Sequence, residues 1–395
     1  MTSRLVAAVA AIAVAVGAAA CTDPQASPDT VTASPQPTPA PEADEAESPS
    51  GPSSPASSAE PSPTGEETSD PAPTGPPRVV GTAATGLAVP WGLDFLPSGE
   101  AVVTERDSRR VLLLDGRGGV REVGVLEQAV PQGEAGLLGV AVSPAFARDR
   151  SLFFYLTTAV DNRIVRAELR GGRLSEPEVL FDGIPAGFIH DGGRLEFGPD
   201  GLLYAATGEA GEPELSRDRD SLGGKILRLT PDGRPAPGNP FGTAVWSWGH
   251  RNVQGLAFDD ADRLWASELG ANTWDELNLI RPGDDYGWPL VEGVGNEGGL
   301  RDPQVVWPTA DASPSGLAHL DGSLWMAALR GGRLWRIPLD GARAGKPRDF
   351  LVGRYGRLRT VAVAPDGTLW VTTSNRDGRG EPAAEDDRVL VVSPG

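Results

Sequence analysis

The sequence predicts an all-β fold, a six-bladed β-propeller, in residues 78–395. A unit of two short apolar strands joined by a Gly/Asp/Pro turn recurs six times along this part of the chain. A second pair of strands follows most copies, as in RRVLLLDGRGG and GRLWRIPLDG, and no segment shows a convincing helical period. Four short strands in each period of 45 to 61 residues are typical of propeller blades.

The six copies align on one apolar position of the second strand. Five are clear: FLPSGEAVVTE, FGPDGLLYAATGE, FDDADRLWASE, HLDGSLWMAA and VAPDGTLWVTT, and a sixth, VSPAFARDRSLFFYLTT, is degenerate. The aligned positions, spaced by 51, 51, 61, 60 and 45 residues, are Ala101, Leu152, Leu203, Leu264, Leu324 and Leu369. A pair of β-sandwiches is the alternative fold, but it does not account for the recurring Pro-x-Gly turn.

The N-terminal residues 1–21 have the pattern of a secretory signal. Arg4 precedes a long Ala/Val run, and small residues lead up to Cys21, the only cysteine of the chain. This arrangement resembles a bacterial lipoprotein signal, in which the cysteine is lipidated, although Ala18 stands where Leu is more common. We therefore expect an extracytoplasmic protein, held at the membrane only through a lipid anchor on Cys21. Ordinary secretion is the alternative.

Residues 22–77 are predicted to be a disordered linker. They contain 15 of the 37 prolines and ten acidic residues, with no Lys or Arg and hardly any large apolar side chain. Such a segment cannot bury enough apolar surface to offset the entropy lost on ordering. We expect an extended acidic tether between the anchor and the propeller.

Charge and cysteine content exclude several classes of protein. The formal net charge is −19, of which residues 78–395 contribute −10, so binding to nucleic acid is not expected. A single cysteine rules out a disulfide scaffold within the chain.

The chain has three histidines, and only one of them has a sequence context that favours a catalytic role. The spacings of 60 and 69 residues that separate His190, His250 and His319 match no local metal-ligand pattern. His319 lies beside a turn, where a surface or strand-packing role is expected. His190 precedes a strand in a glycine-flanked segment, where a neutral imidazole could accept a proton from an alcohol. A hydrogen-bonded structural role for His190 is the alternative.

Five motifs, in order, carry a resemblance to a known family: HDGGRLEFGPDGLLYAATGE, SLGGKILRL, GHRNVQGLAFD, SELGANTWDELNLIRPGDDYGWP and YGRLRTVAVAPDG. Together they resemble the soluble sugar dehydrogenases that depend on pyrroloquinoline quinone (PQQ), the glucose/sorbosone dehydrogenase family. The resemblance extends over about residues 80–392, and its implied fold is also a six-bladed propeller.

The resemblance implies a catalytic group and a cofactor-binding group. His190 matches the general base that takes the proton of the sugar C1 hydroxyl, and Glu209 stands where an Asp usually orients that histidine. Arg251 matches a residue beside the reacting quinone carbonyl. The implied cofactor contacts are Glu134, Arg251, Asn252, Arg330, Arg357 and Arg359. Glu134 and Arg330 replace the Gln and Lys that relatives carry. Planar guanidinium groups suit the three carboxylates of PQQ, whereas each arginine alone could be an ordinary surface residue.

The resemblance also implies calcium in two places. Backbone carbonyls of Gly270 and Ala271 would hold the ion beside the quinone, where Ca²⁺ acts as a Lewis acid. Glu276 and the Tyr286 carbonyl match a second, structural site. Ala271 replaces a usual proline. The alternative is that Asp275, Glu276, Asp284 and Asp285 are solvated loop carboxylates.

The expected function is PQQ- and Ca²⁺-dependent oxidation of an aldose at C1 to the lactone, with electrons passed to an acceptor that the sequence leaves open. One alternative is a calcium-dependent lactonase on a similar propeller. The other is a non-catalytic propeller that has lost the cofactor, which the changes at Glu134, Arg330 and Ala271 keep open.

Overall fold

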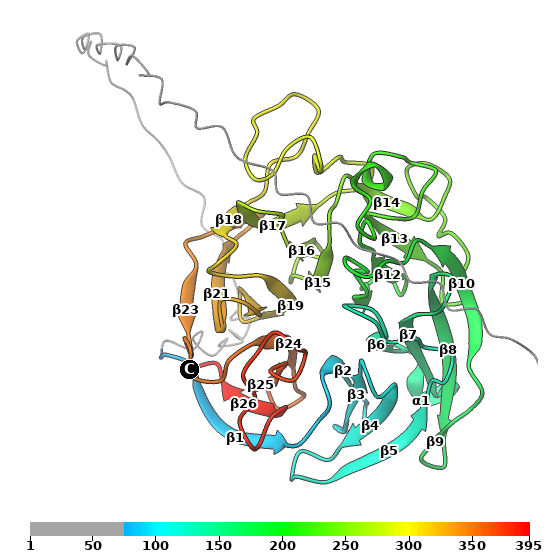
Figure 1. Cartoon of the computed structure of the whole chain (residues 1–395), viewed down its shortest axis with the longest axis vertical. Helices are drawn as coiled ribbons and strands as arrows, with labels where there is room; N and C mark the ends of the chain where they lie inside the picture. The colour runs from blue at the N-terminus through cyan, green and yellow to red at the C-terminus, as the bar shows by residue number, and fades with distance from the viewer. Residues whose placement is uncertain (1–74) are drawn as a thin grey trace, which may run out of the picture. The chain divides into compact units, whose positions relative to one another are not determined.

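The computed structural model describes residues 75–395, which form a ring of six antiparallel sheets (Figure 1). The prediction of a six-bladed propeller is confirmed. The first strand begins at Arg78, where the change in composition placed the domain boundary. The predicted signal, the lipidated Cys21 and residues 22–74 of the linker lie outside the described residues.

The blades follow one another along the chain, each running from an inner to an outer strand. Blade one contains β2 (Pro90–Phe95), β3 (Ala101–Glu105), β4 (Arg110–Leu114) and β5 (Val120–Val125). Blade two contains β6 (Leu137–Val142), β7 (Ser151–Thr157), β8 (Asn162–Arg170), β9 (Arg173–Leu174) and β10 (Glu178–Ile184). Blade three contains β11 (Leu195–Phe197), β12 (Leu203–Ala206), β13 (Lys225–Leu229) and β14 (Val245–Trp248). Blade four contains β15 (Val253–Phe258), β16 (Leu264–Glu268), β17 (Trp274–Ile280) and β18 (Val305–Pro308). Blade five contains β19 (Pro314–Leu320), β20 (Ser323–Ala328), β21 (Arg333–Asp340), β22 (Arg343–Ala344) and β23 (Arg348–Phe350). Blade six contains β24 (Leu358–Val363), β25 (Leu369–Thr373), β26 (Val389–Ser393) and β1 (Arg78–Ala84).

The two ends of the propeller close the ring. Strand β1 pairs antiparallel with β26, so the first strand completes the sheet that the last three strands build (Figure 1). This closure places the last blade beside the first, and Thr360 of β24 donates a hydrogen bond of 2.5 Å to the Trp91 carbonyl of β2.

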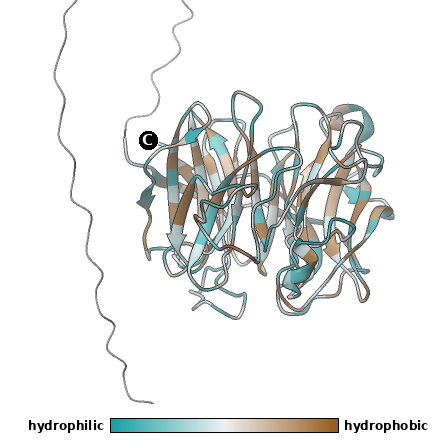
Figure 2. Ribbon diagram, turned by 90° about the horizontal axis from the view of Figure 1, so that it is seen from above, coloured by the Kyte–Doolittle hydropathy of each residue, from teal (hydrophilic) through white to brown (hydrophobic). Residues whose placement is uncertain are grey.

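The apolar core is divided among the blade interfaces. Each of six buried clusters draws its side chains mainly from two neighbouring sheets, as where Val102 of blade one packs with Val140 and Phe154 of blade two. Figure 2 shows apolar residues concentrated in the strands and polar residues in the connecting turns. Burial between sheets thus stabilises the ring, and the turns are left to carry function.

The inner strands approach one another closely around the central axis. A Cβ on Gly139 would lie 2.2 Å from the Gly193 carbonyl oxygen, and one on Gly255 would lie 2.3 Å from the Ser315 carbonyl oxygen. Only glycine allows this approach of backbone to backbone. At these two points the inner strands therefore pack backbone against backbone.

Two short helical turns depart from the all-strand expectation. Helix α1 (Phe146–Asp149) takes the place of the Pro-x-Gly turn in the degenerate copy. Arg150 ends this helix in a left-handed conformation, just before β7. The 3₁₀ turn η1 (Pro213–Ser216) lies in the long loop after β12. Within residues 75–395, no helix has the length and apolar character needed to span a membrane.

Candidate active site

Two kinds of loop meet at one mouth of the channel. One kind follows the second strand of a blade, and the other precedes the first strand of the next. Most of the predicted site residues occupy one of these two positions, at the ends of inner strands that neighbour one another. Three of them stand out: His190 before β11 and Glu209 after β12, which belong to one sequence motif, and Arg251 before β15, which belongs to another.

These three residues form one hydrogen-bonded chain. His190 Nδ1 bonds the Glu209 carboxylate, and His190 Nε2 lies 2.9 Å from the Arg251 guanidinium. The side chain of His190 is 12% exposed and that of Glu209 only 2%. The imidazole is therefore held from both sides and remains open to solvent.

The partners of the ring determine which nitrogen carries the proton. Arginine has no acceptor atom, so His190 Nε2 accepts from Arg251 and Nδ1–H donates to Glu209. This tautomer leaves the lone pair on Nε2, on the Arg251 side of the ring, and it places the Glu209 carboxylate on the Nδ1 side.

The backbone of His190 is also constrained. Its φ is +60°, a conformation unusual for a residue with a side chain. Its amide donates to the Glu134 carboxylate at 3.1 Å, and its carbonyl accepts from the Ala210 amide at 3.0 Å. A Cβ on Gly208 would lie 1.8 Å from that carbonyl oxygen, so only glycine fits at position 208. Such local strain persists where surrounding contacts fix it, and it is common at functional sites.

Several buried polar atoms around His190 have no partner among the described residues. They are Glu209 Oε2, Arg251 Nε, Asn252 Nδ2, Trp288 Nε1 and Asp191 Oδ2. Buried polar groups are almost always hydrogen-bonded. Trp288 also lies with its ring 5.4 Å from the Arg251 guanidinium carbon. A concentration of unsatisfied donors and acceptors beside a partly exposed imidazole indicates a site built for a polar ligand.

Next to this chain of residues lies a cavity of about 290 Å³. Its lining contains five arginines and a single carboxylate; the lining residues are Trp91, Arg106, Glu134, Gln254, Leu269, Ser313, Leu329, Arg330, Arg357, Arg359 and Arg379. The volume is near the lower end of the range for small-molecule sites. An excess of arginine in a strongly acidic protein indicates a ligand with several negative charges.

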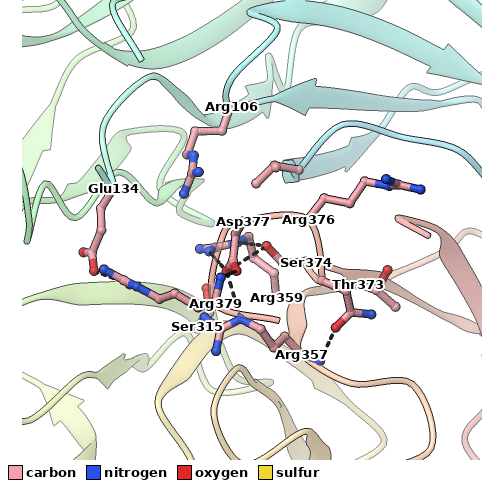
Figure 3. Close-up of polar contacts among 12 residues, drawn as sticks. Arg106, Glu134, Ser315, Arg357, Arg359, Thr373, Ser374, Arg376, Asp377 and Arg379 are labelled. Carbon is pink, nitrogen blue, oxygen red and sulfur yellow. Dashed lines mark hydrogen bonds and ion pairs between the residues drawn. The ribbon is translucent and has the colours of Figure 1, made fainter. Parts of the chain in front are cut away.

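Asp377 holds two of these arginines in place (Figure 3). Its carboxylate lies 2.9 Å from Arg357 and 3.5 Å from Arg359, and Ser374 donates to it at 3.4 Å. Burial lowers the pKa of Arg359 to about 9 despite the charge of Asp377. Burial alone would raise the pKa of Asp377, but the charges of Arg359 and Arg357 outweigh it and lower that pKa.

Arg379 and Glu134 connect the last blade to the loop before β6. Their ion pair is 2.7 Å long, and Figure 3 shows Arg379 extended toward Glu134. Burial raises the pKa of Glu134, but the hydrogen bond and charge of Arg379 outweigh that effect and lower the pKa. Arg330, by contrast, is exposed, and its guanidinium has no hydrogen-bond or ion-pair partner within residues 75–395.

The loop predicted to hold calcium lies directly beside Arg251. Arg251 donates to the carbonyls of Gly270 at 2.7 Å and Leu269 at 3.1 Å. The Gly270 carbonyl therefore faces a positive charge, as a cation ligand would. The Ala271 carbonyl belongs to the same loop. Over residues 75–395, no group of three or more His, Cys, Asp or Glu side chains is arranged to hold a metal.

The alternative that the nearby acids are solvated loop carboxylates is wrong for three of them. Asp275 and Glu276 lie in β17 with 1% and 9% of their surface exposed, and burial raises their pKa values to about 6 and about 8. Asp285 is buried against Arg217, while Asp284 is half-buried and pairs with Arg301. Polar residues also precede DELNLI, so the sequence does not show that Asp275 and Glu276 already belong to β17.

Glu276 and Tyr286 are both buried, as a structural site requires. Glu276 accepts hydrogen bonds from the Gly293 amide at 2.7 Å and from Asn278 at 3.0 Å. The Tyr286 ring stacks on His250, 4.6 Å between centroids. His250 itself is fully buried between Ser247 and Glu268, and His319 packs in β19 as expected. Neither histidine joins His190.

Sequence reasoning missed Arg106, Arg379, Gln254 and Trp91. Arg106 and Arg379 both follow the second strand of a blade, and Gln254 and Trp91 lie at the start of a first strand. Their shared place in the repeat was a usable signal, since the predicted residues occupy the same two places.

On this six-bladed propeller, the linked side chains of His190, Glu209 and Arg251 lie beside an arginine-lined cavity that suits a polyanionic ligand. The chain matches the glucose/sorbosone dehydrogenase family over residues 87–382 and belongs to it. It is 54% identical to the PQQ-bound aldose sugar dehydrogenase of Streptomyces coelicolor, with a TM-score of 0.80 over 82% of this chain and 99% of the other.

Two further relatives agree. A putative oxidoreductase (glucose dehydrogenase) of Thermus thermophilus is 46% identical, with a TM-score of 0.76 over 80% of this chain and 100% of that one. Aldose sugar dehydrogenase YliI of Escherichia coli is 29% identical over 73% of this chain and 88% of its own. The chain is thus an oxidoreductase of the sugar dehydrogenase type.

Proposed function

We propose that this protein oxidises the C1 hydroxyl of aldose sugars to the lactone, using PQQ and calcium. The observation that carries the proposal is the position of His190, held between Glu209 and Arg251 beside a cavity lined by five arginines. PQQ supplies, when bound, the two-electron acceptor for the hydride of sugar C1.

The residues at the cavity fit the cofactor. Arg106, Arg330, Arg357 and Arg359 offer planar donors for its three carboxylates, and Trp91 offers an aromatic wall. The unpartnered amide nitrogen of Asn252 offers a further donor. Asp377 supports this fit because it holds Arg357 and Arg359 at the wall of the cavity.

His190 is the proposed base. Its Nε2 takes the hydroxyl proton as the C1–H bond breaks, and the resulting imidazolium is stabilised by the Glu209 carboxylate on Nδ1. In the structure the Arg251 N–H occupies Nε2, so Arg251 must yield that position to the sugar hydroxyl. The Nε2 side of the ring, and not the Glu209 side, is therefore where substrate binds.

The proposed calcium ion would lie at the carbonyls of Gly270 and Ala271, and a second at Glu276 and Tyr286. The support for the first is that the Gly270 carbonyl already faces the Arg251 cation. The support for the second is a buried carboxylate whose raised pKa reflects burial and the neighbouring charge of Glu268. A cation there would compensate for the burial of the Glu276 carboxylate and for its repulsion by Glu268.

We also propose that the protein acts outside the cytoplasm, anchored through Cys21, and passes electrons to an external acceptor. The sequence pattern of residues 1–21 supports the anchor. A propeller tethered by an acidic linker would reach sugars and acceptors at the outer face of the membrane.

Reconstitution tests the function. Purified apoprotein is mixed with PQQ and either Ca²⁺, Mg²⁺ or chelator, and cofactor absorbance and aldose-dependent dye reduction are measured. We expect PQQ binding and dye reduction with Ca²⁺, and the loss of both in the Arg359→Ala variant at low PQQ concentration. Hydrolysis of a lactone without PQQ would favour the lactonase, and a protein that neither binds PQQ nor turns over would be the non-catalytic module.

A further inference from the structure

One carboxylate organises the loop that follows β16. Glu292 Oε1 accepts hydrogen bonds from four consecutive backbone amides, those of Ala271, Asn272, Thr273 and Trp274, at 2.8 to 3.0 Å. Successive amides that converge on one point form a concave anion site. Here the protein fills that site with a side chain 18 to 21 residues away in sequence.

The neighbouring amide is held in the same way. Gly270 donates to Asp275 at 2.9 Å, and the other oxygen of Asp275 accepts from the Ser313 amide at 2.6 Å. All five amides of residues 270–274 are thus directed at two carboxylates. The carbonyls of Leu269 and Gly270 point to the opposite partner, the Arg251 guanidinium. The loop is polarised, with donors facing acids and acceptors facing a cation.

Glu292 is itself held in position. The amide of Gly293 donates to Glu276 at 2.7 Å, and a Cβ on Gly293 would lie 2.6 Å from the Trp274 ring. The φ of Gly293 is +81°, so glycine is needed there for both space and conformation. One short segment therefore contacts both places where a calcium ion is proposed.

We infer that Glu292 is a positioning residue for the cation site, because its carboxylate holds the amides of Ala271 and Asn272 and thereby orients the Gly270 and Ala271 carbonyls, which belong to the same two peptide groups. This inference rests on the proposed function for the identity of the ion. It adds a residue that neither touches the cofactor cavity nor belongs to the proposed ligands.

The physical reason is that the four amides bound by Glu292 each need a hydrogen-bond acceptor. Without the carboxylate they need other acceptors, and for Asn272 and Thr273, which are exposed, the acceptor at hand is water. Rotation of those peptide groups toward water would also turn their carbonyls. The Gly270 carbonyl, which makes the 2.7 Å contact with Arg251, belongs to the same peptide group as the Ala271 amide and would turn with it.

The test uses Glu292→Ala and Glu292→Gln in the full chain, with Glu297→Gln as control. Glu297 is exposed on the same segment and carries the same charge, without contact to loop 270–274. Hydrogen exchange of the apoprotein is measured at residues 271–274. Binding of PQQ is measured by calorimetry with Ca²⁺ and with chelator, and kcat is compared at saturating PQQ and Ca²⁺.

For Glu292→Ala we expect at least tenfold faster exchange at residues 271–274 and at least tenfold weaker PQQ binding with Ca²⁺. Binding of PQQ in chelator should equal that of the wild type, and kcat at saturation should recover to within about threefold. Glu292→Gln, which retains an acceptor oxygen, should fall between, and Glu297→Gln should match the wild type.

Unchanged exchange at residues 271–274, or faster exchange with unchanged Ca²⁺-dependent PQQ affinity, would overturn the inference alone. An equal loss of PQQ affinity with and without Ca²⁺ would also overturn it, because it would show a general structural defect. A wild-type protein that binds no PQQ under any condition would overturn the proposed function, and with it the inference.

Discussion

Replacing His190 by Gln should separate chemistry from cofactor binding. A positioned general base typically contributes about 10²- to 10⁴-fold in rate, or about 2.7 to 5.4 kcal/mol. The adjacent carboxyl of Asp191 does not take over this role, because it is only 1% exposed and makes neither of the contacts, to Glu209 and Arg251, that position the His190 ring. We therefore expect kcat to fall within that range while PQQ affinity stays within about threefold of the wild type.

For Glu209, the partner of His190, the expected loss of kcat can be worked out more closely. Glu209→Gln keeps an oxygen near His190 Nδ1 but removes the negative charge. A hydrogen bond to a charged group contributes about 1.5 to 3 kcal/mol, against about 0.5 to 1.5 for a neutral pair. The difference of about 1 to 1.5 kcal/mol predicts a loss of roughly tenfold in kcat. This effect should be far smaller than that of His190→Gln.

The assay is steady-state dye reduction with PQQ and Ca²⁺ saturating, alongside PQQ titration of the apoprotein. His319→Gln is a matched control, since His319 lies in β19 among the residues that line a separate cavity, away from His190. It should leave kcat unchanged. The reasoning is refuted if His190→Gln turns over like the wild type, or if saturating PQQ restores its kcat. A Glu209→Gln variant as damaged as His190→Gln would remove the orienting role from Glu209.

Two other predictions concern stability and location. Burial and the nearby charge of Asp94 raise the pKa of Glu196 from its usual 4.5 to about 8. Between those values the unfolded chain releases a proton that the folded protein keeps, so stability falls as pH rises. Glu196→Gln should therefore be more stable than the wild type at pH 8, by on the order of a few kcal/mol in the free energy of unfolding, with little difference at pH 4.5. Denaturant unfolding at the two pH values measures this, and equal midpoints at pH 8 would contradict it. Cys21→Ser should move the protein from the membrane fraction to the soluble fraction, and continued membrane retention would argue against lipidation.

The fold could be predicted from the sequence because the repeat compensates for the ambiguity of each single strand. A single strand such as FDDADRLWASE is weak evidence, but six copies in one register define the blade period. The sites within the blades were accessible only where a long motif carried them, as for His190 and Arg251. Arg106 and Arg379 belong to no such motif, and only the closed ring brings them to one cavity.

Contacts between loops were the least predictable part. Nothing in the segment around Glu292 shows that its carboxylate would meet the amides of residues 271–274, because that meeting depends on the path of the chain after Trp288. The burial of Asp275 was equally hidden, since its partners are backbone amides of Gly270 and Ser313. Carboxylates that bind backbone leave no complementary side chain in the sequence to reveal them.

The charge distribution explains how an acidic protein can serve a polyanionic cofactor. Residues 78–395 carry a net −10, yet five arginines line one cavity. Those arginines would repel one another and spread apart without counter-charges among them. Asp377 lies between Arg357 and Arg359, and Glu134 fixes the exposed Arg379. Asp377 bonds Arg357 through Nε alone and shares Arg359 with Ser374 and Gln254, so both guanidinium groups are fixed at the wall of the cavity. Removing Asp377 should therefore weaken PQQ binding even though it deletes a negative charge from an anion site, the opposite of what net charge alone predicts.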